Sequence, residues 1–134
     1  MDIMGQRINI PANTAWASLL AYSRAVAFGD HVLVAGTLPV DSQGLLVGGD
    51  DAYLQARQVL KVMVDALREA GAKVSDVVRI RIYLRDYEDL ELIARAQFEV
   101  FEHIRPACTL LKADLARPEF RVQMDAEAFI GASK

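Results

Sequence analysis

The side chains best suited to covalent or acid–base chemistry are one cysteine, Cys108, and two histidines, His31 and His103. A thiol becomes a nucleophile when a base or a positive neighbour favours its thiolate, and no feature of the sequence marks such a neighbour. We therefore expect Cys108 to be a small buried hydrophobic residue on a strand, with a nucleophilic role as the alternative. His31 follows a predicted turn, and His103 lies in the last turn of a predicted helix, where the helix dipole favours a cation. Neither histidine is expected to be catalytic.

Motifs for bound cofactors do not occur in the sequence. Histidine, cysteine and carboxylate residues do not recur at the spacing of metal ligands, and neither a glycine-rich phosphate loop nor a nucleophile elbow is present. We therefore expect no metal site and no cofactor.

A cationic strand face is formed by Arg79, Arg81 and Arg85 together with Tyr83. Such a face could contact RNA, or it could pack between subunits or against Asp and Glu. The chain has a net charge of −3 and a pI of about 5.3, which is the wrong sign for general attraction to phosphate backbones. We therefore favour the acidic partners, and nucleic acid is an unlikely partner.

The sequence pattern also predicts the helices and strands that must position these residues. The first is a short strand at 7–10, which ends at Pro11 and is followed by an irregular stretch up to residue 20. Two β-rich runs, 22–28 and 31–38, are separated by Gly29-Asp30, the spacing of a tight hairpin. Apolar residues then recur at helical spacing from Asp51 to residue 70, with Gln55 outside the apolar stripe, and Gly71 stands where a C-terminal cap belongs.

The second half of the chain contains one clear strand and one clear helix. Residues 78–84 alternate between apolar and cationic side chains, which indicates a strand with one face buried. Asp86 is suited to cap a helix with Asp89 in its first turn, and Arg105-Pro106 ends that helix. Two further strands are expected at about 107–114 and 120–130.

This order of elements predicts a single α+β domain over residues 1–134, with a six-stranded sheet and two helices. Two helices can cover only one face of such a sheet. Apolar residues are also more frequent than in most soluble domains. We therefore expect the helix-free face to be apolar and covered by another copy of the chain.

The location of the protein in the cell is predicted from the absence of a membrane span, a signal peptide and a disulfide in the sequence. Apolar stretches are interrupted before they reach the length of a membrane span, and the first ten residues lack the pattern of a signal peptide. A lone cysteine cannot form an internal disulfide. These features lead us to expect a cytoplasmic protein with no membrane contact.

Short segments of the chain, in their order and spacing, resemble the RidA family, also called YjgF/YER057c. The resemblance covers about Tyr22 to Ile130, and it is carried by Ala21–Val26, Val34–Val40, Gln55 with the 67–72 helix end, Asp76–Asp86, Phe98–Phe101, Arg105–Ala107 and Val122–Ala128. It implies a chorismate-mutase-like fold, with a six-stranded mixed sheet, two helices on one face, and a homotrimer whose sheets form a barrel.

The resemblance also implies hydrolysis of reactive enamines and imines, such as 2-aminoacrylate, to 2-oxo acids and ammonia in clefts between subunits. The positions that it assigns to this ligand-binding cleft are Tyr22, Gly36, Thr37, Cys108 and Gln123. In the family's best-known branch an Arg stands at the position of Cys108 and clamps the substrate carboxylate. A Glu at the position of Gln123 positions or activates water.

These two departures argue against the standard 2-aminoacrylate reaction. A forked cationic donor is lost at Cys108, and an amide, unlike a carboxylate, is not a useful general base at Gln123. We expect the cleft to bind a small carboxylate- or carbonyl-bearing metabolite. Lys112 lies on the same face of its strand as Cys108 and could supply a replacement cation, but we favour a solvated surface lysine. Strong activity on 2-aminoacrylate would point to Lys112 or Arg105 as the clamp. Deamination of an unusual enamine or imine is the first hypothesis for its function. A non-catalytic metabolite-binding trimer is the alternative, followed by an RNA-binding protein or endoribonuclease.

Overall fold

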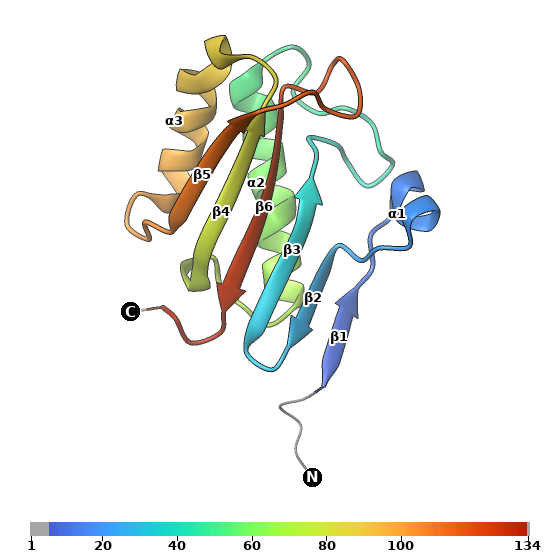
Figure 1. Cartoon of the computed structure of the whole chain (residues 1–134), viewed down its shortest axis with the longest axis vertical. Coiled ribbons are helices and arrows are strands. Elements are labelled where there is room, and N and C mark those ends of the chain that lie inside the picture. The colour runs from blue at the N-terminus through green and yellow to red at the C-terminus, as the bar shows by residue number, and fades with distance from the viewer. Residues whose placement is uncertain (1–5, 134) are drawn as a thin grey trace.

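A mixed six-stranded sheet with two long helices on one face forms the fold (Figure 1), here as a computed structural model that describes residues 6–133. The strand order is β1-β2-β3-β6-β4-β5, and only the β4–β5 pair is parallel among the named strands. The strands are β1 (Arg7–Ile10), β2 (Ala25–Phe28), β3 (His31–Thr37), β4 (Val77–Leu84), β5 (Ala107–Lys112) and β6 (Val122–Phe129). The helical elements are α1 (Ala15–Leu20), α2 (Ala52–Glu69), η1 (Val74–Asp76), η2 (Tyr87–Asp89) and α3 (Leu90–Phe101). The predicted α+β class is confirmed.

The predicted hairpin and first long helix both form. Phe28 pairs with His31 across the turn, where Gly29 has a φ of +61°. Asp51 caps α2 by accepting hydrogen bonds from the backbone N–H groups of Tyr53 and Leu54. The helix lays its apolar stripe against the sheet, and the buried residues of this stripe are Ala52, Ala56, Val59, Leu60, Met63, Ala66 and Leu67.

The start of the chain is more regular than expected, because α1 forms within the stretch predicted to be irregular. Thr14 caps this helix, with its Oγ1 accepting a hydrogen bond from the backbone N–H of Ala17 at 3.2 Å. Ala21 ends it in the left-handed region. A helix of six residues is too short to show apolar periodicity, so the cap was its only signal in the sequence.

The start of α3 also differs from the prediction. Asp86 accepts a hydrogen bond from the N–H of Glu88 at 2.9 Å, but it caps the short η2 turn, and α3 begins at Leu90. Asp89 turns away from the helix terminus, and its Oδ2 accepts a hydrogen bond from Arg121 Nη1 at 3.0 Å. A guanidinium offers this carboxylate a stronger partner than the backbone does.

Gln55 is fully buried, whereas its position outside the apolar stripe predicted a polar surface. Its Nε2 donates to the carbonyls of Gly49 at 2.7 Å and Glu119 at 2.9 Å, and its Oε1 accepts from the N–H of Arg121 at 2.8 Å. The loop between β5 and β6 folds over α2 and covers this amide. Gln55 therefore fixes that loop to the start of α2.

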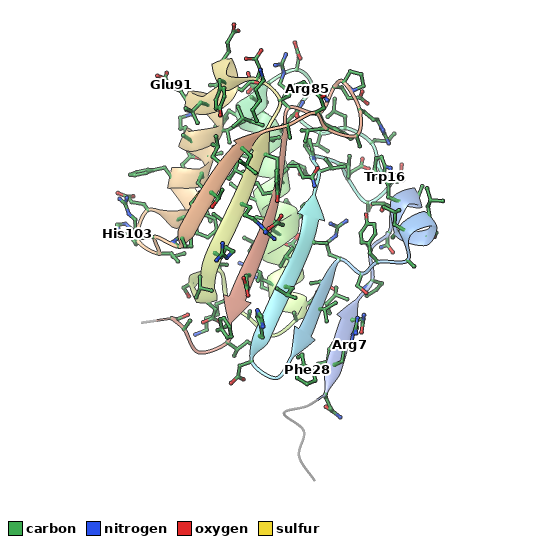
Figure 2. The ribbon with its side chains drawn as sticks, in the orientation of Figure 1. Arg7, Trp16, Phe28, Arg85, Glu91 and His103 are labelled. Atoms are coloured by element: carbon green, nitrogen blue, oxygen red, sulfur yellow. The ribbon has the colours of Figure 1, made fainter. Side chains whose placement is uncertain are left out.

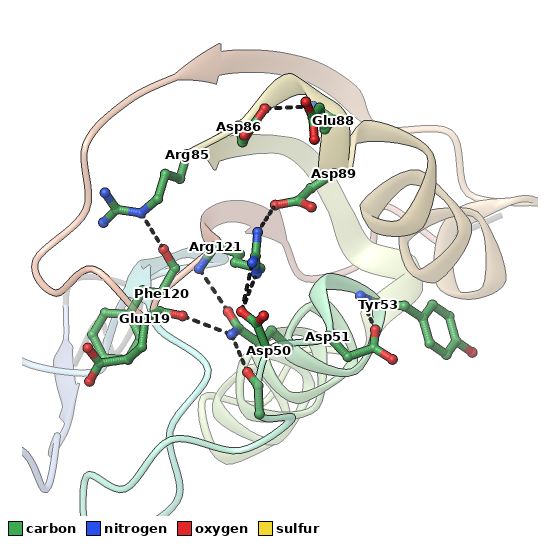
Figure 3. A network of polar contacts seen from close by, with 12 residues as sticks. Asp50, Asp51, Tyr53, Arg85, Asp86, Glu88, Asp89, Glu119, Phe120 and Arg121 are labelled. Carbon is green, nitrogen blue, oxygen red and sulfur yellow. Dashed lines mark hydrogen bonds and ion pairs between the residues drawn. The ribbon is translucent and has the colours of Figure 1, made fainter.

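Two arginines complete this connection (Figure 3). Arg121 donates to Asp50 at 2.7 Å and to Asp89 at 3.0 Å, and these hydrogen bonds raise the pKa of the guanidinium. Arg85 donates from Nε to the carbonyl of Phe120 at 2.9 Å and from Nη2 to that of Arg117 at 2.7 Å. The β5–β6 loop is thereby held over the ends of β4, α2 and α3.

The centre of the helix-free face is charged, so the expectation of an apolar face is wrong. Arg81 Nε donates to Asp125 Oδ1 at 2.8 Å, and the hydroxyl of Tyr83 donates to Asp125 Oδ2 at 2.9 Å. Arg79 lies 3.5 Å from Glu127. The predicted pairing of the cationic strand with acidic residues is confirmed for Arg79 and Arg81.

Most of the large exposed apolar side chains on this face lie at one end, apart from Leu111 on β5. Phe28, Leu33 and Phe129 are all exposed there, and Figure 2 shows Phe28 near the end of the sheet from which Arg7 projects. Charged residues alternate with buried ones along both β4 and β6. The arginines of β4 and the acids of β6 therefore all lie on the helix-free face, where they pair with one another.

Candidate functional site

Gly36 and Gln123 face each other where β3 departs from regular pairing with β6. The register shifts between Val34 and Thr37, which marks a bulge in β3. A Cβ atom built on Gly36 would lie 2.4 Å from Nε2 of Gln123, so this position has no space for a larger residue unless the amide moves. The two predicted cleft residues are therefore packed against each other.

Thr37 and Tyr22 lie beside this bulge. Thr37 is buried, and its hydroxyl donates to the carbonyl of Ala35 at 2.8 Å. The hydroxyl of Tyr22 lies 3.2 Å from Oγ1 of Thr14, the residue that caps α1. Four of the five predicted cleft residues thus surround the end of β3.

Arg24 joins these residues, although the sequence analysis did not single it out. Its Nη1 lies 3.5 Å from the carbonyl oxygen of Gly36 and 3.4 Å from Oγ1 of Thr37. Burial lowers the pKa of this guanidinium. We call Tyr22, Arg24, Gly36 and Thr37 the Arg24 cluster. The signal in the sequence was a charged residue two positions after Tyr22, directly before the buried strand β2.

A cavity of about 470 Å³ opens beside Arg24, between the start of the chain and α2. Thr14 lines it together with Arg24, and the walls include the apolar residues Leu38, Val40 and Val62. A cavity of this size suits a small ligand.

Cys108 lies elsewhere, on the edge strand β5. It pairs with Ile80 on the helix side of the sheet, whereas Gln123 pairs with Tyr83 on the helix-free side. Strand β4 also separates β5 from β6. One chain therefore does not bring Cys108 together with the other four predicted residues.

The expected burial of Cys108 is wrong, because the residue is exposed in this chain. β5 is the outermost strand, and α3 leaves over it an apolar cavity of about 280 Å³ that Cys108 lines with Phe98 and Phe101. Partial desolvation in this position raises the pKa of the thiol. The thiol is therefore protonated at neutral pH, which disfavours the nucleophilic alternative.

The remaining titratable candidates have other partners. His31 Nε2 lies 2.6 Å from Glu127 Oε2, and its ring stacks on Phe129. His103 is exposed in the loop after α3, as Figure 2 shows, and lies 3.6 Å from its neighbour Glu102. Within residues 6–133 neither histidine contacts the Arg24 cluster.

Lys112 and Arg105, the two candidate replacement cations, are both exposed, which agrees with the favoured interpretation of Lys112 as a surface lysine. Lys112 ends β5. Arg105 donates from Nε to the carbonyl of Glu102 at 2.7 Å and thereby closes the end of α3. The guanidinium of Arg105 also lies over the ring of Phe98. Water can solvate both cations, so neither needs an anionic ligand.

Residues 6–133 contain neither a cluster of metal ligands nor a membrane-spanning helix. In this range no three His, Cys, Asp or Glu side chains lie close enough together to hold a metal ion. None of the helices described there combines the length and apolar character needed to cross a membrane.

Comparison with known proteins gives consistent matches over nearly the whole chain. The family model described as endoribonuclease L-PSP matches residues 12–130. A protein named 3-aminoacrylate deaminase RutC, from Acinetobacter baylyi, is 31% identical over 127 residues, covering 95% of this chain and 100% of that protein. A RutC family protein from Pyrococcus abyssi is 31% identical over 109 residues, covering 81% of this chain and 85% of that protein.

A solved structure supports the same conclusion. The crystal structure of Rv2704 from Mycobacterium tuberculosis, described as a member of the YjgF/YER057c/UK114 family, has a TM-score of 0.84 and 32% identity. The match covers 93% of this chain and 100% of that one. The six-stranded sheet, its two covering helices and the aligned sequence agree, and the chain therefore belongs to the YjgF/RidA family.

Proposed function

We propose that this protein is a hydrolytic deaminase of a small enamine or imine that carries a carboxylate or carbonyl group. An enamine first becomes the imine by gaining a proton on carbon and losing one from nitrogen. Water then adds to the carbon of the C=N bond, the C–N bond breaks, and a carbonyl compound and ammonia leave. The observation that carries the proposal is the Arg24 cluster, which places a cation and two hydroxyls at the end of β3, where Gly36 packs against Gln123, in a member of the YjgF/RidA family. The name of the RutC relative supports deamination as the reaction class.

The roles of the residues follow from their chemistry. The amide of Gln123 can hold a water molecule by a hydrogen bond, but it cannot take a proton from that water as a carboxylate can. The hydroxyl of Tyr22 can orient the ligand. The substrate must therefore be reactive enough for positioned water to attack it without a strong general base.

The direct test measures ammonia release from 2-aminoacrylate and 3-aminoacrylate, each generated in situ, with and without the protein. Release that grows in proportion to protein concentration supports the proposal. Binding of small acids with no acceleration for either substrate would favour the alternative, a non-catalytic metabolite-binding protein. That alternative is supported by the amide at position 123 and the missing Arg at position 108.

The third hypothesis, RNA binding or cleavage, loses support from the charges on the sheet. Arg79 and Arg81 are paired with Glu127 and Asp125, so they offer little free positive charge to a phosphate backbone. Nuclease activity that co-purifies with the protein through several columns would restore this hypothesis.

We further propose that the cleft forms between the subunits of a homotrimer. Cys108 lies on an exposed edge strand, far from the other predicted cleft residues in the sheet order, so a second chain is needed to bring it to them. The apolar cavity between α3 and β5 offers surface for that contact.

The protein is expected to behave as a trimer in solution. Light scattering after size-exclusion chromatography should give a mass about three times the 14.8 kDa of one chain. The measurement should be made at micromolar concentrations of protein. A monomer that persists under these conditions would contradict the proposed assembly.

A further inference from the structure

Arg24 is a half-buried cation whose charge is not balanced by the rest of the described chain. Moving a guanidinium out of water is unfavourable unless a carboxylate or several good hydrogen bonds replace the water. Within residues 6–133 no carboxylate lies within ion-pair distance of Arg24, and its two contacts, at 3.4 and 3.5 Å, are at the outer limit of a hydrogen bond. The remaining N–H groups of the guanidinium have no partner there.

Two other half-buried arginines show the contrast. Arg85 donates to backbone carbonyls at 2.7 and 2.9 Å, and Arg121 donates to two carboxylates at 2.7 and 3.0 Å. Both hold the β5–β6 loop, so their burial serves the fold. Arg24 has no comparable structural role, and the usual reason to retain a costly buried charge is function.

The surroundings of Arg24 indicate what it binds. The cavity beside it also contains Lys61, which is paired with Asp65 at 3.0 Å, and Asp41, which accepts hydrogen bonds from its own turn. Glu69 lines the cavity as well, but none of these acids reaches Arg24. The hydroxyls of Thr14 and Tyr22 lie within 3.2 Å of each other near Arg24 and can donate to an anion.

We propose that Arg24 binds the carboxylate of the substrate, in place of the Arg that family members carry at the position of Cys108. The ligand class is a small 2-oxo or 2-imino acid. Its carboxylate lies against the free N–H groups of Arg24, and its carbon chain lies against Leu38, Val40 and Val62. This inference deepens the proposed function and rests on it for the substrate class.

Arg24 is preferred over Arg105 and Lys112 for a physical reason. Those two side chains are exposed, so water solvates them and their lack of an anionic partner costs little. The half-buried position of Arg24 makes the missing anion energetically important. The preference therefore rests on burial, not on closeness to Cys108.

The test compares Arg24→Gln with wild type in two measurements, the affinity for 2-oxo acids and the melting temperature. The probes are pyruvate, 2-oxobutyrate and phenylpyruvate, with methyl pyruvate as a ligand that lacks the negative charge. We expect Arg24→Gln to weaken acid binding by about tenfold to 100-fold. We expect methyl pyruvate to bind both proteins equally weakly, and Arg24→Lys to retain part of the affinity.

The melting temperature without ligand separates a binding role from a structural one. Removing an unbalanced buried charge should raise the melting temperature of Arg24→Gln by about 2 °C or more. The matched control is Arg85→Gln, which removes a guanidinium that bonds three backbone carbonyls. Arg85→Gln should lower the melting temperature and leave pyruvate affinity unchanged.

The outcomes also separate this inference from the proposed function. Acid binding that is lost in Arg24→Gln, in a protein with no deaminase activity, would support the binding role and reject the enzyme. Deaminase activity with an unchanged KM in Arg24→Gln would reject the binding role and keep the enzyme. Failure of the wild type to bind any of the three acids, or destabilisation of Arg24→Gln like that of Arg85→Gln, would overturn the inference.

Discussion

Replacing Cys108 by Arg and Gln123 by Glu in one chain is expected to raise the rate of 2-aminoacrylate hydrolysis by about 100-fold over wild type. The first change adds a second forked cation, besides Arg24, at the position where the resemblance to the RidA family implies an Arg clamp, and the second change adds a proton acceptor. Because both groups act on one transition state, the double variant should gain more than the product of the two single gains. The measurement is ammonia release from substrate generated in situ.

The single variants and the mass of the assembly provide the controls. Cys108→Arg alone should improve KM, whereas Gln123→Glu alone should act mainly on kcat. Each variant should elute at the same volume as wild type. A correctly assembled double variant with no gain would mean that this cleft is shaped for another ligand, and high wild-type activity would mean that Arg24 alone is a sufficient clamp for 2-aminoacrylate.

The substitution Gln55→Leu is expected to lower the free energy of unfolding by about 3 kcal/mol or more. Leu has nearly the same volume as Gln, but it leaves the carbonyls of Gly49 and Glu119 and the N–H of Arg121 without partners. These groups lie under the β5–β6 loop and cannot all reach water. Denaturant unfolding at a fixed protein concentration measures the loss.

A matched control lies on the same helix. Gln58 donates one hydrogen bond, to the carbonyl of Val40 at 2.8 Å, so Gln58→Leu should cost only about 1 kcal/mol. If Gln55→Leu and Gln58→Leu cost the same, the amide of Gln55 does not hold the loop as we describe.

Elements with strong local patterns could be predicted from the sequence. α2 combines a capping Asp51, a long apolar stripe and a closing Gly71, and from Arg79 to Leu84 the strand β4 alternates buried residues with exposed or half-buried ones. The hairpin follows from Gly29-Asp30 between two β-rich runs. In each case the signal lies within a few residues of the element that it specifies.

Features that depend on distant segments could not be predicted. Gln55 is buried by a loop more than 60 residues away, and Asp89 is turned toward Arg121 by that same loop. Cys108 is exposed because β5 takes the edge of the sheet, a position that no local pattern specifies. Arg24 is marked by its burial and its missing partner, and both properties exist only in the folded chain.

The position of β5 has a consequence for how the protein is made. This strand pairs with β4 along one side only, and its side chains are almost all exposed, including the apolar Leu111. The open edge of such a strand is a template for any other extended chain, including a partly folded copy of the same protein. Newly synthesised chains therefore face a competition between orderly association and aggregation. The yield of folded protein should depend on how soon that edge is covered.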